Sequence, residues 1–180
     1  MIEYKDDFLR KISDLNKPII ISEGNNKSYI EKAKSFHGSD LDFEVFNLKE
    51  LGDKEMLKLF SFLVKTQNNE PKKIFVLDCD AMDTYKKMIN ISTDYLIPFI
   101  FENNISNVII NKGIENLFDN SLIDESKHYN RKVIPADYGG SVTKVEFDKN
   151  KFENYICNER NMENDFNKFK PFFEKLREIL

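Results

Sequence analysis

Three acidic residues of this chain have the types and the spacing of a divalent-metal site. Glu23 follows the short apolar run at residues 18–21, while Asp78 and Asp80 follow the apolar run at residues 73–77. In an extended chain, residues two apart point the same way, so the two aspartates lie about 7 Å apart at the backbone. Such a pair can hold Mg²⁺ or Mn²⁺, because hard cations take oxygen ligands and keep water for chemistry.

The segments that carry these acids are predicted to be buried strands of a parallel sheet. Both apolar runs are short and rich in β-branched residues, which favours strands. Helical spacing follows each run, at residues 26–36 and 82–88. Alternation of strand and helix predicts an α/β fold with helices on both faces of the sheet. Since ligands bind at the carboxyl ends of such strands, we expect Glu23, Asp78 and Asp80 to converge on one site.

The remaining elements complete a single α/β domain with a mostly parallel central sheet. We expect an N-terminal helix within residues 1–17, a core at 18–125, and a loop with a C-terminal helical extension at 126–180. Within these parts, the pattern predicts helices at 4–15 and 54–65, strands at 43–46 and 95–101, a short helix at 114–118 and a loop at 137–144. In the tail, apolar residues from Phe166 to Leu180 form one stripe, and Pro171 starts or kinks the helix.

Composition and charge limit the classes of protein to which the chain can belong. A net charge of -4 and a pI of about 5.4 argue against gripping nucleic acid by a general basic surplus. The longest apolar stretch, at residues 95–101, is far shorter than the roughly 20 residues that span a bilayer. The N-terminus lacks the apolar centre of a secretory signal, so we expect a cytoplasmic protein with no membrane association. Cys79 and Cys157 stand apart from other metal ligands, and they predict neither a disulfide framework nor a zinc site.

Three segments resemble the TOPRIM domain of topoisomerases, primases and several nucleases. The segment IIISEG at residues 19–24 is similar to the family's strand that ends in Glu-Gly, and IFVLDCD at 74–80 is similar to its strand that ends in Asp-x-Asp. The segment KGIENLF at 112–118 resembles one in the overcoming-lysogenization-defect (OLD) nuclease branch. The resemblance extends from residue 18 to about residue 122 and implies a TOPRIM-like, Rossmann-like fold.

The resemblance also implies roles for individual residues in a metal-dependent phosphodiester chemistry. Glu23 corresponds to an acid/base or metal ligand, and Asp78 and Asp80 correspond to metal-holding aspartates. Glu115 and Asp83 are further candidates for metal ligation. Two carboxylate-bound ions would stabilise both the attacking and the leaving oxygen of a phosphoryl displacement. The plainer alternatives are that Glu23 favours a helix dipole and that Glu115 lies on a solvated helix face.

Several basic residues are candidates for phosphate binding. Lys27 occupies a position where many members of the nuclease branch have an acid, and at a helix N-terminus it could contact a phosphate. Cys79 stands where that branch frequently has Arg. Lys149 and Lys151 precede Phe152 and could neutralise a phosphate in the transition state, although a solvated face is the favoured interpretation of both.

The leading hypothesis is a Mg²⁺-dependent TOPRIM nuclease that acts on DNA or RNA. The resemblance suggests a bacterial anti-phage or toxin-like effector, standing alone or working with a separate ATPase partner, and it leaves a homo-oligomer open. One alternative is a non-catalytic TOPRIM-shaped interaction or regulatory module. Another is a haloacid-dehalogenase-like phosphatase with Asp78 as the nucleophile, in which the Thr or Val that follows the motif would fall at Met82.

Overall fold

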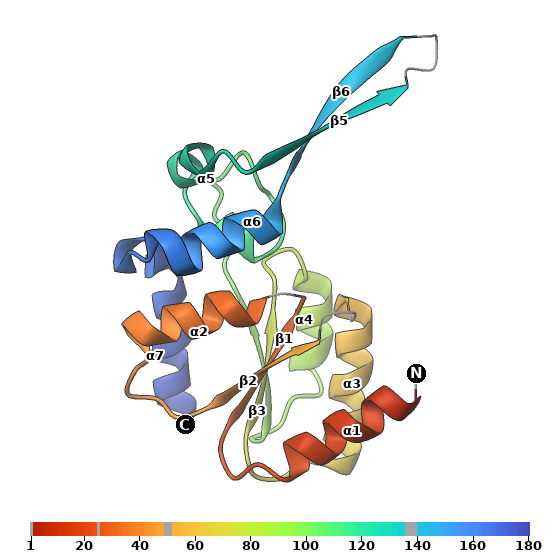
Figure 1. Ribbon diagram of the computed structural model, residues 1–180. Helices are drawn as coiled ribbons and strands as arrows, with labels where there is room; N and C mark the ends of the chain where they lie inside the picture. The colour runs from red at the N-terminus through yellow and green to blue at the C-terminus, as the bar shows by residue number, and fades with distance from the viewer. Residues whose placement is uncertain (1, 25, 49–51, 136–139) are drawn as a thin grey trace.

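The central sheet has four parallel strands (Figure 1). The computed structural model describes the backbone of residues 2–24, 26–48, 52–135 and 140–180, and the side chains of these residues except 2–7, 130–135 and 141–145. The strands are β1 (Ile19–Glu23), β2 (Glu44–Leu48), β3 (Lys73–Leu77) and β4 (Leu96–Ile100), in the order β2-β1-β3-β4. The prediction of an α/β fold with a parallel sheet is confirmed.

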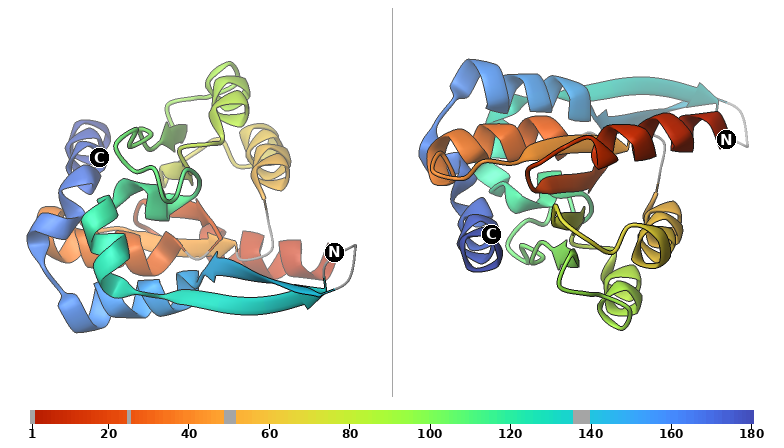
Figure 2. Two further views of the ribbon diagram at one scale, coloured as in Figure 1. Left: turned by 90° about the horizontal axis from the view of Figure 1, so that it is seen from above. Right: turned by 90° about the horizontal axis from the view of Figure 1, so that it is seen from below.

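Helices cover both faces of this sheet, as Figures 1 and 2 show. The helices of one face are α1 (Ile2–Ser13), α3 (Asp53–Thr66) and α4 (Met82–Ile89), and those of the other are α2 (Asn26–His37) and α7 (Lys170–Ile179). Successive strand residues point to opposite faces. Accordingly, Phe75 and Leu77 pack in the core beneath α1, α3 and α4, whereas Ile74 and Val76 pack beneath α2 and α7.

The core beneath α2 and α7 is rich in aromatic side chains. Phe118 is almost fully buried, and its ring centroid lies 5.3–6.0 Å from the rings of four neighbours, Tyr29, Phe152, Phe166 and Phe169. Pro171 lies in the first turn of α7, so it starts this helix. The predicted apolar stripe continues through Leu176, but Leu180 is 43% exposed and lies outside it. This cluster ties the C-terminal extension to the sheet.

The segment between the sheet and the tail differs from the prediction. After a 3-10 helix, η1 (Ile114–Leu117), and α5 (Asn120–Ser126), the chain forms an antiparallel hairpin of β5 (Tyr129–Pro135) and β6 (Ser141–Phe147). The predicted loop at 137–144 is wrong for residues 141–144, which lie in β6, while 137–139 lie outside the described residues. The glycines at 139 and 140 are typical of a turn. The alternating β-branched residues that follow them, at 142, 143 and 145, indicate a strand that the prediction did not include.

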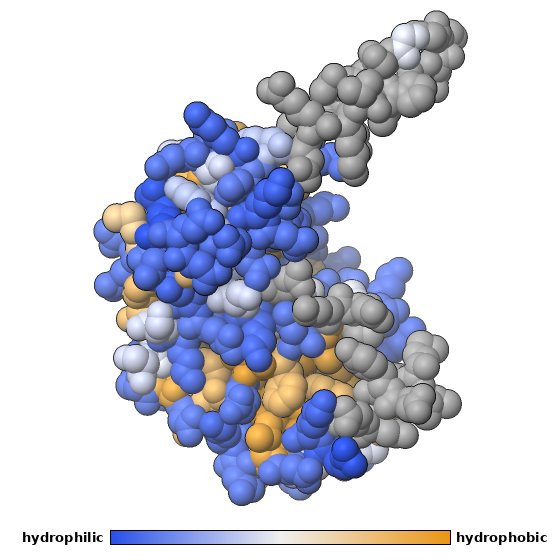
Figure 3. All heavy atoms as spheres, in the orientation of Figure 1, coloured by the Kyte–Doolittle hydropathy of each residue, from blue (hydrophilic) through white to orange (hydrophobic). Residues whose placement is uncertain are grey.

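The hairpin projects from the upper part of the molecule in Figure 1 and leads back into helix. The chain continues as α6 (Lys149–Asn154), a π-helical segment (Tyr155–Arg160) and a 3-10 helix, η3 (Glu163–Phe169), before α7. The surface over α6 and the π-helical segment is hydrophilic (Figure 3). Through α6, the residues after the hairpin return to the carboxyl edge of the sheet.

Within the described part of the chain, no helix has the length and apolar character needed to cross a membrane.

Candidate active site

The sheet has a topological switch point between β1 and β3. From β1 the chain crosses through α2 on one face to β2, and from β3 it crosses through α4 on the other face to β4. The two connections diverge, which opens a crevice at the carboxyl ends of β1 and β3, where ligands of α/β folds bind. Ser22 pairs in register with Val76, so Glu23 and Asp78 follow within one or two residues of this pair.

Two adjoining pockets open at this crevice and share Glu23, Asp78 and Lys149. One, of about 300 Å³, is lined by the charged side chains of Glu23, Asp53, Asp78, Asp80, Lys112 and Lys149. The other, of about 450 Å³, is lined by Glu23, Asn26, Asp78, Glu115, Lys149 and Glu153 among others. The structure therefore gathers the three acids of the sequence prediction around one pocket.

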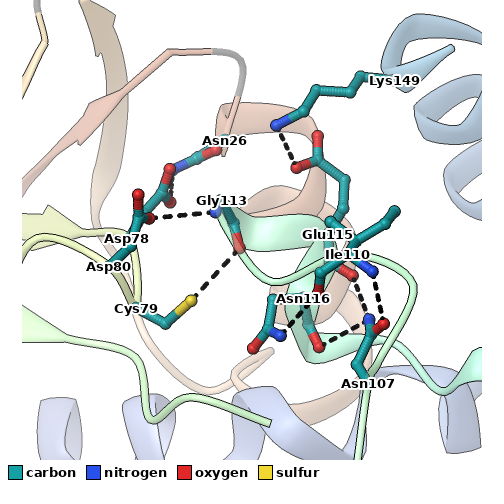
Figure 4. A network of polar contacts seen from close by, with 10 residues as sticks. All are labelled: Asn26, Asp78, Cys79, Asp80, Asn107, Ile110, Gly113, Glu115, Asn116 and Lys149. Carbon is teal, nitrogen blue, oxygen red and sulfur yellow. Dashed lines mark hydrogen bonds and ion pairs between the residues drawn. The ribbon is translucent and has the colours of Figure 1, made fainter. Parts of the chain in front are cut away.

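Asp78 is the most deeply buried acid of the DxD segment, and one hydrogen bond orients it. Asn26 Nδ2, in the first turn of α2, donates to Asp78 Oδ1 at 2.7 Å (Figure 4). Burial raises the pKa of Asp78 to about 6, the Asn26 hydrogen bond opposes this rise, and the charges of Glu115 and Asp80 add to it. Ionisation of Asp78 is therefore less favourable than in water, and a nearby cation would offset this free-energy cost.

Glu23 is the last residue of β1, and one oxygen of its carboxylate accepts no hydrogen bond from the described residues. Its Oε2 is buried and has no hydrogen-bond partner among the described residues. Burial, followed by the charges of Asp78, Asp53 and Asp80, raises the pKa of Glu23 to about 7. A buried polar atom without a partner is costly, and a carboxylate oxygen can be satisfied by a cation or a proton. This donor set therefore fits a hard divalent cation.

Gly113 brings the loop before η1 onto the acidic pair. Its N–H donates to Asp80 Oδ1 at 3.1 Å, and its carbonyl oxygen accepts from Cys79 Sγ at 3.7 Å (Figure 4). The residue has a φ of +77°, and a Cβ here would lie 2.8 Å from both Glu115 Oε2 and Lys149 Nζ. The backbone conformation therefore favours glycine, and a Cβ here would displace the charged ends of Glu115 and Lys149 from their present positions.

Glu115 and Lys149 form an ion pair across the pocket. Lys149 Nζ lies 2.8 Å from Glu115 Oε2, and only 7% of the Glu115 side chain is exposed. Burial alone would lower the pKa of Lys149, but Glu115, with Asp78 and Asp80, raises it above its ordinary value. Lys149 is exposed, as the solvated-face interpretation has it, although it also lines both pockets. Glu115, by contrast, is buried, so the solvated-face interpretation is wrong for this residue.

Three predicted site residues lie away from these pockets. Asp83 is exposed in the first turn of α4 and lines neither pocket. Lys27 contacts Glu31 of its own helix, with 3.5 Å between Nζ and Oε1. Lys151 contacts Asp148 at 3.4 Å between Nζ and Oδ2. A local carboxylate therefore engages each of these lysines, and the structure does not bring them together with Glu23 and Asp78.

Sequence reasoning missed three residues of the site: Asn26, Asp53 and Lys112. Asn26, in the first turn of α2, donates its amide N–H to Asp78. Asp53 opens α3, five residues after the strand residue Leu48, and so belongs to the same edge of the sheet. The rule that ligands gather at the carboxyl ends of parallel strands could have indicated Asp53 if it had been applied to β2 as well.

The carboxylates surround the pockets without forming a closed ligand cluster. Among the described residues, no three or more His, Cys, Asp or Glu side chains are grouped closely enough to hold a metal ion. A separate partner orients each of three acids: Asn26 for Asp78, the Gly113 N–H for Asp80, and Lys149 for Glu115.

Comparison with known proteins adds no further assignment. No family model matches the chain, and no curated protein or solved structure is significantly similar to it.

Proposed function

We propose that this chain is a Mg²⁺- or Mn²⁺-dependent nuclease of the TOPRIM type that hydrolyses phosphodiester bonds of DNA or RNA. The observation that carries the proposal is the shared pocket of Glu23, Asp78 and Asp80 at the switch point of the sheet. The buried, unpartnered Glu23 Oε2 in the same pocket adds support, since it gives a cation a preformed oxygen ligand.

The residues of the pocket have distinct chemical capacities in such a reaction. Asp78 and Asp80 would hold the cation, which supplies Lewis-acid stabilisation of a phosphoryl oxygen. Without a bound cation the pKa of Glu23 is about 7, so this carboxyl group could either exchange a proton near neutral pH or, once ionised, bind the cation. Lys149 presents an ammonium group over the pocket and can neutralise charge that develops on a phosphate.

The acidic balance of the chain supports a regulated enzyme that works with a partner. Among the described residues that line the first pocket, only Lys112 and Lys149 are basic, against four carboxylates. Binding of a polyanion ordinarily requires several Lys or Arg contacts to phosphate. We therefore propose a cytoplasmic defence or toxin-like effector whose partner, such as a separate ATPase, supplies further basic surface.

The Glu115–Lys149 ion pair favours a second candidate function. Lys149 forms an ion pair with Glu115, so the Glu115 carboxylate of the second pocket already has a counter-ion. A module of this shape could bind metal or a partner protein without turnover. The two candidates differ in one observable: only the nuclease converts a nucleic-acid substrate into products.

Cleavage by the purified chain tests the proposal. Single- and double-stranded DNA and RNA are incubated with Mg²⁺ or Mn²⁺, with a chelator as the blank. We expect metal-dependent products that Glu23→Gln and Asp78→Asn abolish, while Asp94→Asn, an exposed residue near the opposite edge of the sheet, retains full activity. Metal-dependent binding without cleavage would favour the non-catalytic module. Hydrolysis of p-nitrophenyl phosphate alone would indicate a phosphatase.

A further inference from the structure

Asp53 contributes a fourth carboxylate to the first pocket. It comes from the segment after β2, whereas the other acids come from the ends of β1 and β3. If all these side chains are ionised, four carboxylates of the pocket face two lysines, one of which, Lys149, is already paired with Glu115. The pocket therefore carries an excess of negative charge that a divalent cation would offset.

A buried hydroxyl group fixes the position of Asp53. Thr84 is 4% exposed in α4, and its Oγ1 donates to Asp53 Oδ2 at 3.0 Å. Helix α4 begins at Met82, two residues after Asp80, so this hydrogen bond ties Asp53 to the helix that leaves the DxD segment. An outer partner of this kind orients a metal-ligating carboxylate and leaves its other oxygen for the ion.

A purely structural role for Asp53 is available but incomplete. An acid in the first turn of a helix interacts favourably with the helix dipole. Glu55, in the same first turn of α3, also has this interaction. The dipole accounts for neither the buried Thr84 partner nor the place of Asp53 in the pocket.

We infer that Asp53, oriented by Thr84, is a ligand of the divalent cation that binds between Glu23, Asp78 and Asp80. The inference rests on the proposed function, because it assigns a further ligand to the same site. It means that the carboxylates would come from the end of β1, from the residues that follow β3, and from the start of α3, the helix after β2.

Mn²⁺ binding to the full chain tests this inference without any cleavage assay. The electron paramagnetic resonance signal of free Mn²⁺ is followed during titration of the parent chain and three variants, Asp53→Asn, Thr84→Val and Glu55→Gln. We expect Asp53→Asn to weaken binding at least about 10-fold and Thr84→Val about 10-fold, as for losses around metal sites generally. Glu55→Gln removes the same charge from the same helix turn and should leave binding unchanged.

Each outcome of this titration decides a separate question. Equal Mn²⁺ binding by the parent chain and Asp53→Asn would overturn the inference while leaving the proposed function standing. No Mn²⁺ binding by the parent chain would overturn both. Equal losses in Asp53→Asn and Glu55→Gln would assign the effect to the helix terminus. Circular dichroism melts in chelator check folding, and Thr84→Val keeps the test decisive if Asp53→Asn does not fold.

Discussion

The aromatic core beneath α7 and the acidic edge of the sheet lie along the same strands, yet they have opposite energetics. In the core, Phe118 has ring partners on several sides and almost no contact with water. At the edge, Asp78 and Glu23 are buried among like charges, which raises the pKa of both. The comparison teaches that the core stabilises an arrangement that the carboxylates would not adopt alone, as is typical of functional sites.

The largest expected effect comes from removing the centre of the aromatic core. Phe118→Ala should lower the free energy of unfolding by about 3–5 kcal/mol, because it deletes a buried ring and leaves a cavity. Urea denaturation at constant pH measures the loss. Phe62, which is 46% exposed on α3, provides the matched control, and Phe62→Ala should cost less than about 1 kcal/mol. Similar losses for both variants would show that the aromatic cluster is not the main support of the fold.

A smaller effect of opposite sign is expected at the edge. Asp78→Asn should keep the Asn26 hydrogen bond, since the amide oxygen can still accept, and it removes a buried charge. Without divalent metal at pH 8, we expect a gain of about 1–2 kcal/mol in the free energy of unfolding. Denaturation in chelator measures it. A loss of stability in Asp78→Asn would mean that its carboxylate supports the fold.

The dependence of stability on pH follows from the same two acids. Folding raises the pKa of Asp78 from 3.8 to about 6 and that of Glu23 from 4.5 to about 7. Their protonated forms favour the folded state, so this contribution is fully present below about pH 4 and is lost as the pH rises to about 7. Thermal melts in chelator from pH 4 to 8 should therefore show this loss in the parent chain and less of it in Asp78→Asn. Parallel curves for the two proteins would contradict the assignment.

The smallest effect concerns the salt dependence of nucleic-acid binding. Because Lys112 and Lys149 are the basic side chains described in the first pocket, log Kd for duplex DNA should change with log salt by a slope of about 2 or less. Fluorescence anisotropy at several salt concentrations measures the slope, and Lys149→Gln should reduce it by about 1. Tight binding with a much steeper slope would reveal a clustered basic surface and remove the main support for a partner.

Much of the sheet and part of the site follow from local sequence patterns. The strand residues 19–21 and 73–77 are buried, and both runs are short and contain β-branched residues, so periodicity and propensity agree there with the fold. The common edge of parallel strands predicts that Glu23, Asp78 and Asp80 lie near one another, and all three line one pocket of the structure. That these three residues bind a metal ion stays a prediction.

The residues that local patterns did not predict depend on contacts far apart in the sequence. Lys149 reaches Glu115 only because the hairpin of β5 and β6 returns the chain to the sheet, and the hairpin itself was overlooked. Asp53 acquires its position from Thr84, a partner 31 residues away. Asp83 and Lys151 were also predicted as site residues, but Asp83 is exposed on α4 and Lys151 contacts Asp148.

Crystals grown with Mn²⁺ test the central claim most directly. Anomalous diffraction locates the ion independently of any assumption about the reaction. The account predicts a peak between the carboxyl ends of β1 and β3, within about 2.0–2.6 Å of carboxylate oxygens of Glu23 and Asp78, the range of oxygen ligation for hard cations. Crystals at saturating Mn²⁺ with peaks only elsewhere, or with none at this edge, would contradict the assignment of a metal-dependent site.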